Sequence, residues 1–203
     1  MIGPRWGASG SALRGAPGYT LVELFFAIGV LVTLAAVALP VTTAGLEDAR
    51  VRSAARYLAA RLREARMLAV HRSARVGLRF EPSGDDYAFG TFLDGNGNGV
   101  RSAEILRGVD PPLRPVERLK DNVAGVRFGL LPGVPLVDGG AGTDPVRIAS
   151  GSILSFSPDG SSSGGTLYLR GVGSAQYAVR VFGVTGRTRV LRYAQGSRTW
   201  VAL

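Results

Sequence analysis

Few residues of this chain have side chains that could do chemistry. It has 203 residues, no cysteine and one histidine, His71. The lack of Cys excludes disulfides and thiol nucleophiles, and a single His makes a His-rich metal site or a Ser-His-Asp relay hard to assemble. Residues 161–163 are serines in a turn that lacks the context of a Gly-x-Ser-x-Gly nucleophile elbow, and no lysine follows a Gly-rich loop. The sequence therefore predicts a protein that is not an enzyme and uses no cofactor.

One loop places oxygen-bearing side chains at alternate positions: Asp94, Asn96 and Asn98, followed by Gly99 and then Glu104. Hard cations such as Ca²⁺ take several oxygens from alternate positions, a Gly that turns the chain and a later acid. Asn and Gly also form turns that need no metal, because they readily adopt positive φ. We therefore predict a plain turn and no metal site. The alternative is a calcium site, whose affinity would be weak because few of its ligands are charged. Its candidate ligands are Asp94, Asn96, Asn98 and Glu104.

Arginine supplies nearly all of the positive charge, which amounts to 24 basic against 15 acidic residues and a net charge of +9. Residues 166–203 contain six Arg and no acid. Arg187 and Arg189 lie two apart where a predicted strand enters a hairpin, so we expect them to face the same side, and planar guanidinium groups bind phosphate well. They are the candidate DNA-binding residues, with Tyr193 and Trp200 as candidate stacking surfaces. The alternative is a solvated sheet edge, with both aromatic rings in the core.

The longest apolar stretch lies near the N-terminus. Residues 24–46 form a run of 23 residues without a charge, long enough to span a bilayer core as a helix. A secretory signal peptide is the alternative, but its apolar core is about 7–15 residues long. Glu23 stands directly before the run, and an acid at membrane depth is costly unless it is paired. A Glu that is protonated or reaches the membrane surface is the other interpretation of this residue.

The junction at residues 18–23 (GYTLVE), followed at once by the apolar run, resembles the cleavage and methylation site of type IV prepilins and of the pseudopilins of type II secretion. The resemblance implies that a prepilin peptidase cuts after Gly18 and that Tyr19, where most relatives have Phe, becomes N-methylated. It also assigns Glu23 to assembly. Glu23 of one subunit would neutralise the freed amine of Tyr19 in its neighbour, and this pairing would fix the axial register of stem helices in a filament.

Beyond the apolar run, residues 46–76 contain no Gly or Pro, and apolar residues recur there at helical spacing. We therefore predict one helix from about Thr20 to about His71, whose apolar stripe must bury against another element, most simply a sheet. From Arg75 onward a period of two replaces the helical spacing. It predicts strands at residues 75–80, 87–93, 124–130, 152–156, 166–170, 177–183 and 188–193, and an irregular loop at 131–151.

Three turn motifs narrow the resemblance. Residues 92–99 (FLDGNGNG), 156–160 (FSPDG) and 185–189 (TGRTR) resemble, in this order, the turns of the GspH/FimT group of minor pseudopilins and minor pilins. The expected fold is α+β and pilin-like: a long N-terminal stem helix, transmembrane in its first half, packed on an antiparallel β-sheet head domain. The implied divisions are a leader peptide (1–18), a transmembrane and assembly half of the stem (19–45) and a periplasmic head (46–203).

The resemblance implies a minor pseudopilin of the H type in the type II protein secretion system. Such a protein is a structural subunit of the periplasmic pseudopilus that helps to export folded proteins, and it crosses the inner membrane once with its C-terminal domain in the periplasm. Its implied partners are other pseudopilins or pilins through the stem helix, the prepilin peptidase and the inner membrane. The alternative is a FimT-like type IV minor pilin that binds DNA for natural transformation. A more distant alternative is a signal-anchored periplasmic enzyme.

Overall fold

The computed structural model describes residues 18–149 and 151–203, and the side chains of all of these except 37–44. The predicted leader lies outside the described residues except for Gly18. The helices are α1 (Leu21–Arg72), α2 (Ser102–Leu106) and α3 (Leu119–Asn122). The strands are β1 (Val76–Ser83), β2 (Asp86–Leu93), β3 (Pro112–Arg118), β4 (Arg127–Phe128), β5 (Val146–Ile148), β6 (Ile153–Phe156), β7 (Gly165–Arg170), β8 (Gln176–Val181), β9 (Thr188–Ala194) and β10 (Thr199–Ala202).

Helix α1 has 52 residues, and its ends lie within one residue of the predicted ones. At its start the hydroxyl of Thr20 accepts the backbone N–H of Glu23 at 3.2 Å, which is the usual N-cap bond. At its end Ser73 adopts a positive φ of 50° and the N–H of Ala74 bonds to the carbonyl of Ala69. A residue in this left-handed conformation is a common helix stop, so the chain leaves the helix here.

The chain divides into two compact units, Met1–Val41 and Thr42–Leu203, and the second contains every strand of the described residues. No helix in the described part of the chain has the length and hydropathy needed to cross a membrane, and the side chains of residues 37–44, within the predicted transmembrane half, lie outside the described residues.

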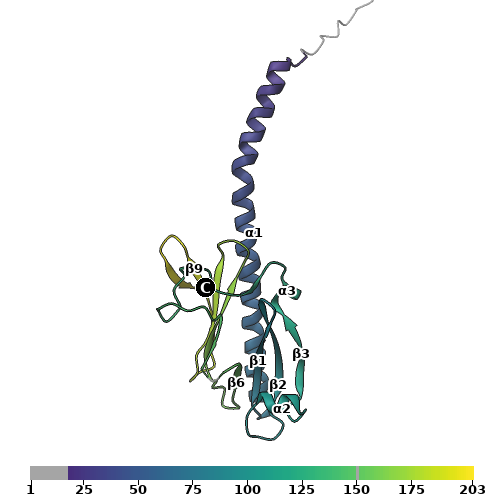
Figure 1. Cartoon of the computed structure of the whole chain (residues 1–203), viewed down its shortest axis with the longest axis vertical. Coiled ribbons are helices and arrows are strands. Elements are labelled where there is room, and N and C mark those ends of the chain that lie inside the picture. Colours follow the sequence, from purple (N-terminus) through teal and green to yellow (C-terminus); the bar gives the residue numbers. More distant parts are fainter. Residues whose placement is uncertain (1–17, 150) are drawn as a thin grey trace, which may run out of the picture. The chain divides into compact units, whose positions relative to one another are not determined.

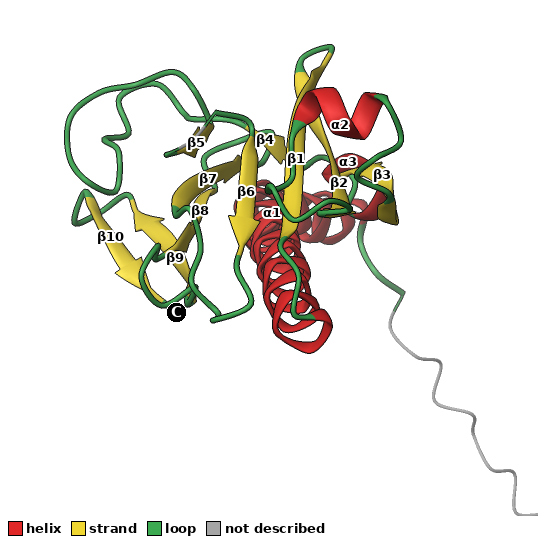
Figure 2. Ribbon diagram, turned by 90° about the horizontal axis from the view of Figure 1, so that it is seen from below, coloured by secondary structure: helices red, strands yellow, loops and turns green. Residues whose placement is uncertain are grey.

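The strands form two antiparallel sheets. The first has the order β3-β2-β1-β6, and the second has the order β10-β9-β8-β7-β4, with β5 also paired to β7. Viewed along the helix, β6 lies between β1 of the first sheet and β7 and β8 of the second (Figure 2). The expected α+β class, a helix followed by an antiparallel β domain, is therefore confirmed.

The core is the surface where the second half of α1 meets both sheets (Figure 1). The helix contributes fully buried Leu58 and Leu62 together with alanines that let the strands come close. The first sheet adds Phe80, whose ring stacks on Phe89 with centroids 5.8 Å apart, and the second adds Val179. The apolar stripe predicted on the helix is thus buried against sheet, as expected.

The sequence pattern missed three strands and overestimated one. β3 is an edge strand with two prolines and mostly exposed side chains, so it lacks the alternation that marks a half-buried strand. β5 lies inside the predicted irregular loop, and β10 has four residues. The predicted strand 124–130 shrinks to the two residues of β4.

The predicted loop 131–151 covers the outer face of the second sheet. Its Leu136 packs with Tyr168 and Leu191 in a separate apolar cluster. The N–H of Val137 donates to the hydroxyl of Tyr168 at 2.9 Å, and the indole N–H of Trp200 donates to the carbonyl of Pro135 at 2.9 Å. This loop therefore gives the second sheet a second buried face.

Tyr193 and Trp200 belong to this outer layer. Tyr193 is buried, and its ring centroid lies 5.3 Å from that of Trp200. Trp200 itself is only partly exposed and uses its single N–H on Pro135. Of the two interpretations of these rings, packing in the core is the one that the structure supports.

Candidate functional site

The three residues of the predicted processing and assembly site lie just before α1 and in its first turn. Gly18 and Tyr19 precede the helix, and the side chain of Tyr19 is 85% exposed. Glu23 lies in the first helical turn, where Thr20 caps its N–H. Sequence reasoning missed the role of Thr20, although Thr-x-x-Glu before an apolar run is the sequence signature of a capping box.

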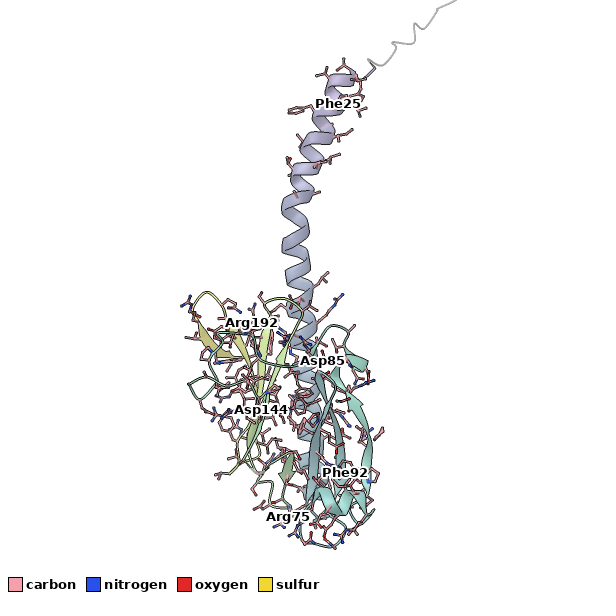
Figure 3. The ribbon with its side chains drawn as sticks, viewed as in Figure 1. Phe25, Arg75, Asp85, Phe92, Asp144 and Arg192 are labelled. Atoms are coloured by element: carbon pink, nitrogen blue, oxygen red, sulfur yellow. The ribbon has the colours of Figure 1, made fainter. Side chains whose placement is uncertain are left out.

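Every described side chain from 18 to 36 is exposed, and most of them are apolar. Phe25 is 68% exposed and Phe26 is 74% exposed, and both lie in the part of α1 that has no charged side chain after Glu23. Figure 3 shows Phe25 projecting from the helix surface. Contiguous apolar surface on this scale marks an interaction site or a membrane contact, so this segment requires an apolar partner.

The head holds the helix at Glu47 and Asp48. The N–H of Gly173 donates to Glu47 Oε1 at 2.7 Å. The hydroxyl of Tyr177 donates to Asp48 Oδ1 at 3.1 Å, and Arg192 pairs with the same oxygen at 3.0 Å. Burial raises the pKa of the Tyr177 hydroxyl, as does its bond to Asp48. No local sequence pattern predicts these contacts, because they join residues more than a hundred positions apart.

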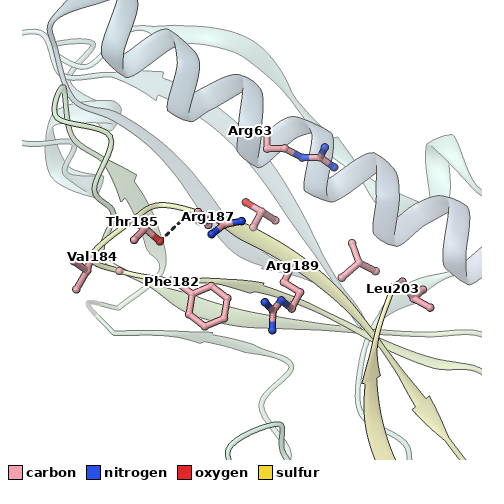
Figure 4. Close-up of a pocket in the computed structure, with 10 residues that line it drawn as sticks. Arg63, Phe182, Val184, Thr185, Arg187, Arg189 and Leu203 are labelled. Atoms are coloured by element: carbon pink, nitrogen blue, oxygen red, sulfur yellow. Dashed lines mark hydrogen bonds between the residues drawn. The ribbon is translucent and has the colours of Figure 1, made fainter.

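The two predicted arginines line one groove of about 670 Å³ between α1 and the β8–β9 hairpin (Figure 4). Arg63 of α1 lies across from the hairpin, and Phe182, Val184 and Leu203 supply apolar surface. The guanidinium of Arg189 lies 5.6 Å from the centroid of the Phe182 ring, a cation–π arrangement. Sequence reasoning missed Arg63, since nothing in the helix pattern shows which face meets the hairpin.

The charge of this groove is not neutralised by nearby acids. Among the described residues, none of Arg63, Arg187 and Arg189 forms a salt bridge with a carboxylate, whereas neighbouring Arg180 pairs with Asp138 at 2.5 Å. Guanidinium groups in this state bind phosphate or carboxylate groups. The arrangement can therefore hold an anion.

The loop after β2 folds around its own acids. Asp94 accepts the backbone N–H of Gly97 and of Gly99, each at 2.7 Å. Glu104 Oε1 accepts the side-chain amides of Asn96 at 3.3 Å and Asn98 at 2.9 Å. The hydrogen bond from Asn98 lowers the pKa of the Glu104 carboxyl.

The four candidate calcium ligands therefore do come together, although only two of them are acids. In the described part of the chain, no group of three or more His, Cys, Asp or Glu side chains is placed to hold a metal ion.

His71 lies exposed in the last turn of α1. At this end of a helix the dipole favours a positively charged side chain.

Comparison with known proteins gives one match. Residues 54–185, more than half of the chain, match the sequence model of the family described as "Type II transport protein GspH". The match runs from the second half of α1 through β8 to the turn before β9. Searches of curated proteins and of solved structures found no match.

Proposed function

Because the chain belongs to the GspH family of type II transport proteins, we propose that it is an H-type minor pseudopilin of the type II secretion system. In this role it is a structural subunit of the periplasmic pseudopilus and helps to export folded proteins. One observation supports this specific role in addition to the family membership. The first turns of α1 expose apolar side chains on all sides directly after Glu23, as a stem that packs against other stems or lipid requires.

The proposed life history of the subunit follows from its first residues. The uncharged run 24–46 holds the precursor in the inner membrane with its head in the periplasm. A prepilin peptidase removes the leader after Gly18, and Tyr19 is then methylated on its new amine. The head supports the stem through the Glu47 and Asp48 contacts, and other pseudopilins bind along the apolar segment.

The proposed assembly contact joins the amine of Tyr19 to the carboxylate of Glu23 in the neighbouring subunit. The freed amine is a cation at the N-terminal end of α1, where the helix dipole disfavours positive charge. A carboxylate from a neighbour compensates both the amine and the dipole, and the pairing removes the cost of an isolated acid at membrane depth. The contact is head-to-tail and does not close, so it generates a helical filament.

A second candidate function rests on the arginine groove. Arg63, Arg187 and Arg189 line it without acidic partners among the described residues, as phosphate binding requires. A FimT-like minor pilin would use this groove to hold DNA for uptake. Affinity of that kind comes from phosphate contacts and falls steeply with salt.

One complementation experiment separates the two functions. We expect deletion of the gene to block export of folded proteins, and both the wild-type chain and the Arg187→Ala/Arg189→Ala variant to restore it, since neither arginine belongs to the stem. DNA uptake is measured in the same strains. The matched control is Arg50→Ala/Arg72→Ala, which removes two exposed arginines outside the groove and changes net charge equally.

The outcomes differ for each candidate. Normal export in the deletion strain contradicts the secretion role. Loss of DNA uptake in the deletion strain, with rescue by the control variant and not by the groove variant, establishes the DNA-binding role instead. Loss of uptake in both double variants would mean that general charge, rather than this groove, is responsible.

A further inference from the structure

Glu104 has a carboxylate oxygen that the fold leaves without a partner. The residue is 7% exposed. Its Oε1 accepts two amide N–H groups and lies 3.9 Å from the guanidinium of Arg107, which is largely exposed. Its Oε2 is buried and accepts no hydrogen bond from any described residue. A buried ionised oxygen in this state is costly. An additional positive group at this position would remove the cost.

The surroundings of Glu104 are built from oxygen donors. Asp94 is 7% exposed, and the chain wraps around it through Gly97 and Gly99, which have positive φ values of 83° and 93°. Asn96 and Asn98 direct their amide ends at Glu104. The oxygen and nitrogen of such an amide exchange places by a half-turn of the group, so the same positions can present two oxygens to a cation.

We propose that residues 94–104 form a binding site for a divalent cation of the calcium type. The carboxylates of Asp94 and Glu104 and the amide oxygens of Asn96 and Asn98 are its side-chain ligands. Ca²⁺ prefers such hard oxygen donors and accepts irregular coordination. Glu104 comes one position earlier than the last acid of a standard twelve-residue calcium loop, and the short helix α2 nevertheless turns it toward Asn96 and Asn98.

The composition of the site sets its strength. Two carboxylates are few for a calcium loop, and affinity rises with the number of charged ligands. We therefore expect a dissociation constant of about 10⁻⁴–10⁻³ M, in the range of extracellular modules. Ser102, the ninth residue counted from Asp94, occupies a ligand position of calcium loops that here carries no charge.

The test is calorimetric titration of the purified full chain in detergent with CaCl₂, with MgCl₂ as the competing ion. We expect calcium to bind and to raise the unfolding temperature relative to EDTA. Asp94→Asn and Glu104→Gln should each weaken binding by about tenfold or more, because each removes one of two ligand charges. Ser102→Asp adds a third charge and should tighten binding by about tenfold. Asp159→Asn, in a turn where Asp159 accepts hydrogen bonds from Ser161, should bind as the wild type does.

Each outcome decides the proposal. Ser102→Asp is informative even where Glu104→Gln fails to fold, since a merely structural loop gains no calcium affinity from it. The proposal is overturned by no calcium binding up to about 10 mM, ten times the weakest constant expected. Unchanged affinity in Asp94→Asn or in Ser102→Asp overturns it as well.

Discussion

A subunit carrying Glu23→Ala is expected to enter the membrane and to lose its leader, yet to be missing from the assembled filament. The change leaves the apolar run 24–46 intact, so insertion should not suffer. It removes the carboxylate that compensates the amine of the neighbouring Tyr19. Because truncating one partner of a desolvated charge pair leaves the other uncompensated, incorporation should fall by roughly thirtyfold or more. Quantitative immunoblotting of sheared filaments against the membrane fraction measures the ratio.

The matched control is Glu81→Ala, the same substitution on β1 of the head. Glu81 has a side chain that is 45% exposed and pairs with Arg79, so its loss should leave incorporation near the wild-type level. Glu23→Gln adds a test of mechanism. It keeps the size and polarity of the side chain and removes the charge, and it should assemble as poorly as the alanine variant. Filaments that contain Glu23→Ala at the wild-type level would refute the proposed pairing.

Phe80→Ala should produce the largest loss of stability in the head. Phe80 is fully buried where α1 meets the first sheet, and it contacts the rings of Phe89 and Phe128 with centroids 5.8 Å away in both cases. Replacing a buried Phe by Ala costs about 3–5 kcal/mol of unfolding free energy. For a chain of this size the unfolding temperature should fall by about 6–20 °C. Thermal unfolding of the full chain followed by circular dichroism measures the shift.

Val184→Ala provides the comparison for Phe80→Ala. Val184 is 92% exposed in the turn between β8 and β9, and a surface substitution of this kind usually stays within about 0.5 kcal/mol of the wild type. Equal unfolding temperatures for Phe80→Ala and Val184→Ala would mean that Phe80 does not lie in the core described above.

The sequence predicted the helix and most strands because their patterns are local. The start of α1 follows from the apolar run and its end from the change to a period of two. Buried strands such as β7 and β8 are short apolar runs in the sequence. β3 escaped prediction because it contains two prolines and most of its side chains are exposed, so that it shows no alternation of buried and exposed positions. The packing of the loop against Tyr168 and Trp200 depends on contacts between distant residues, which no local pattern contains.

Local sequence patterns predicted the candidate sites only in part, for the same reason. Period-two spacing placed Arg187 and Arg189 together, and both line the groove. Arg63 joins them only because the hairpin lies against one particular face of α1. Likewise, the spacing of Asp94 and the two asparagines suggested a turn with oxygen ligands, but the burial of Glu104 and its unpartnered oxygen follow from the folded loop.

The central claim, that the chain is a processed subunit of a type II filament, is tested most directly by mass spectrometry of the mature N-terminus. The full chain is purified from membranes of a strain that contains the prepilin peptidase, and its N-terminal peptide is sequenced. The account predicts that this peptide begins with N-methylated Tyr19. A peptide that begins at Met1, or at a small residue beyond the apolar run, would contradict it.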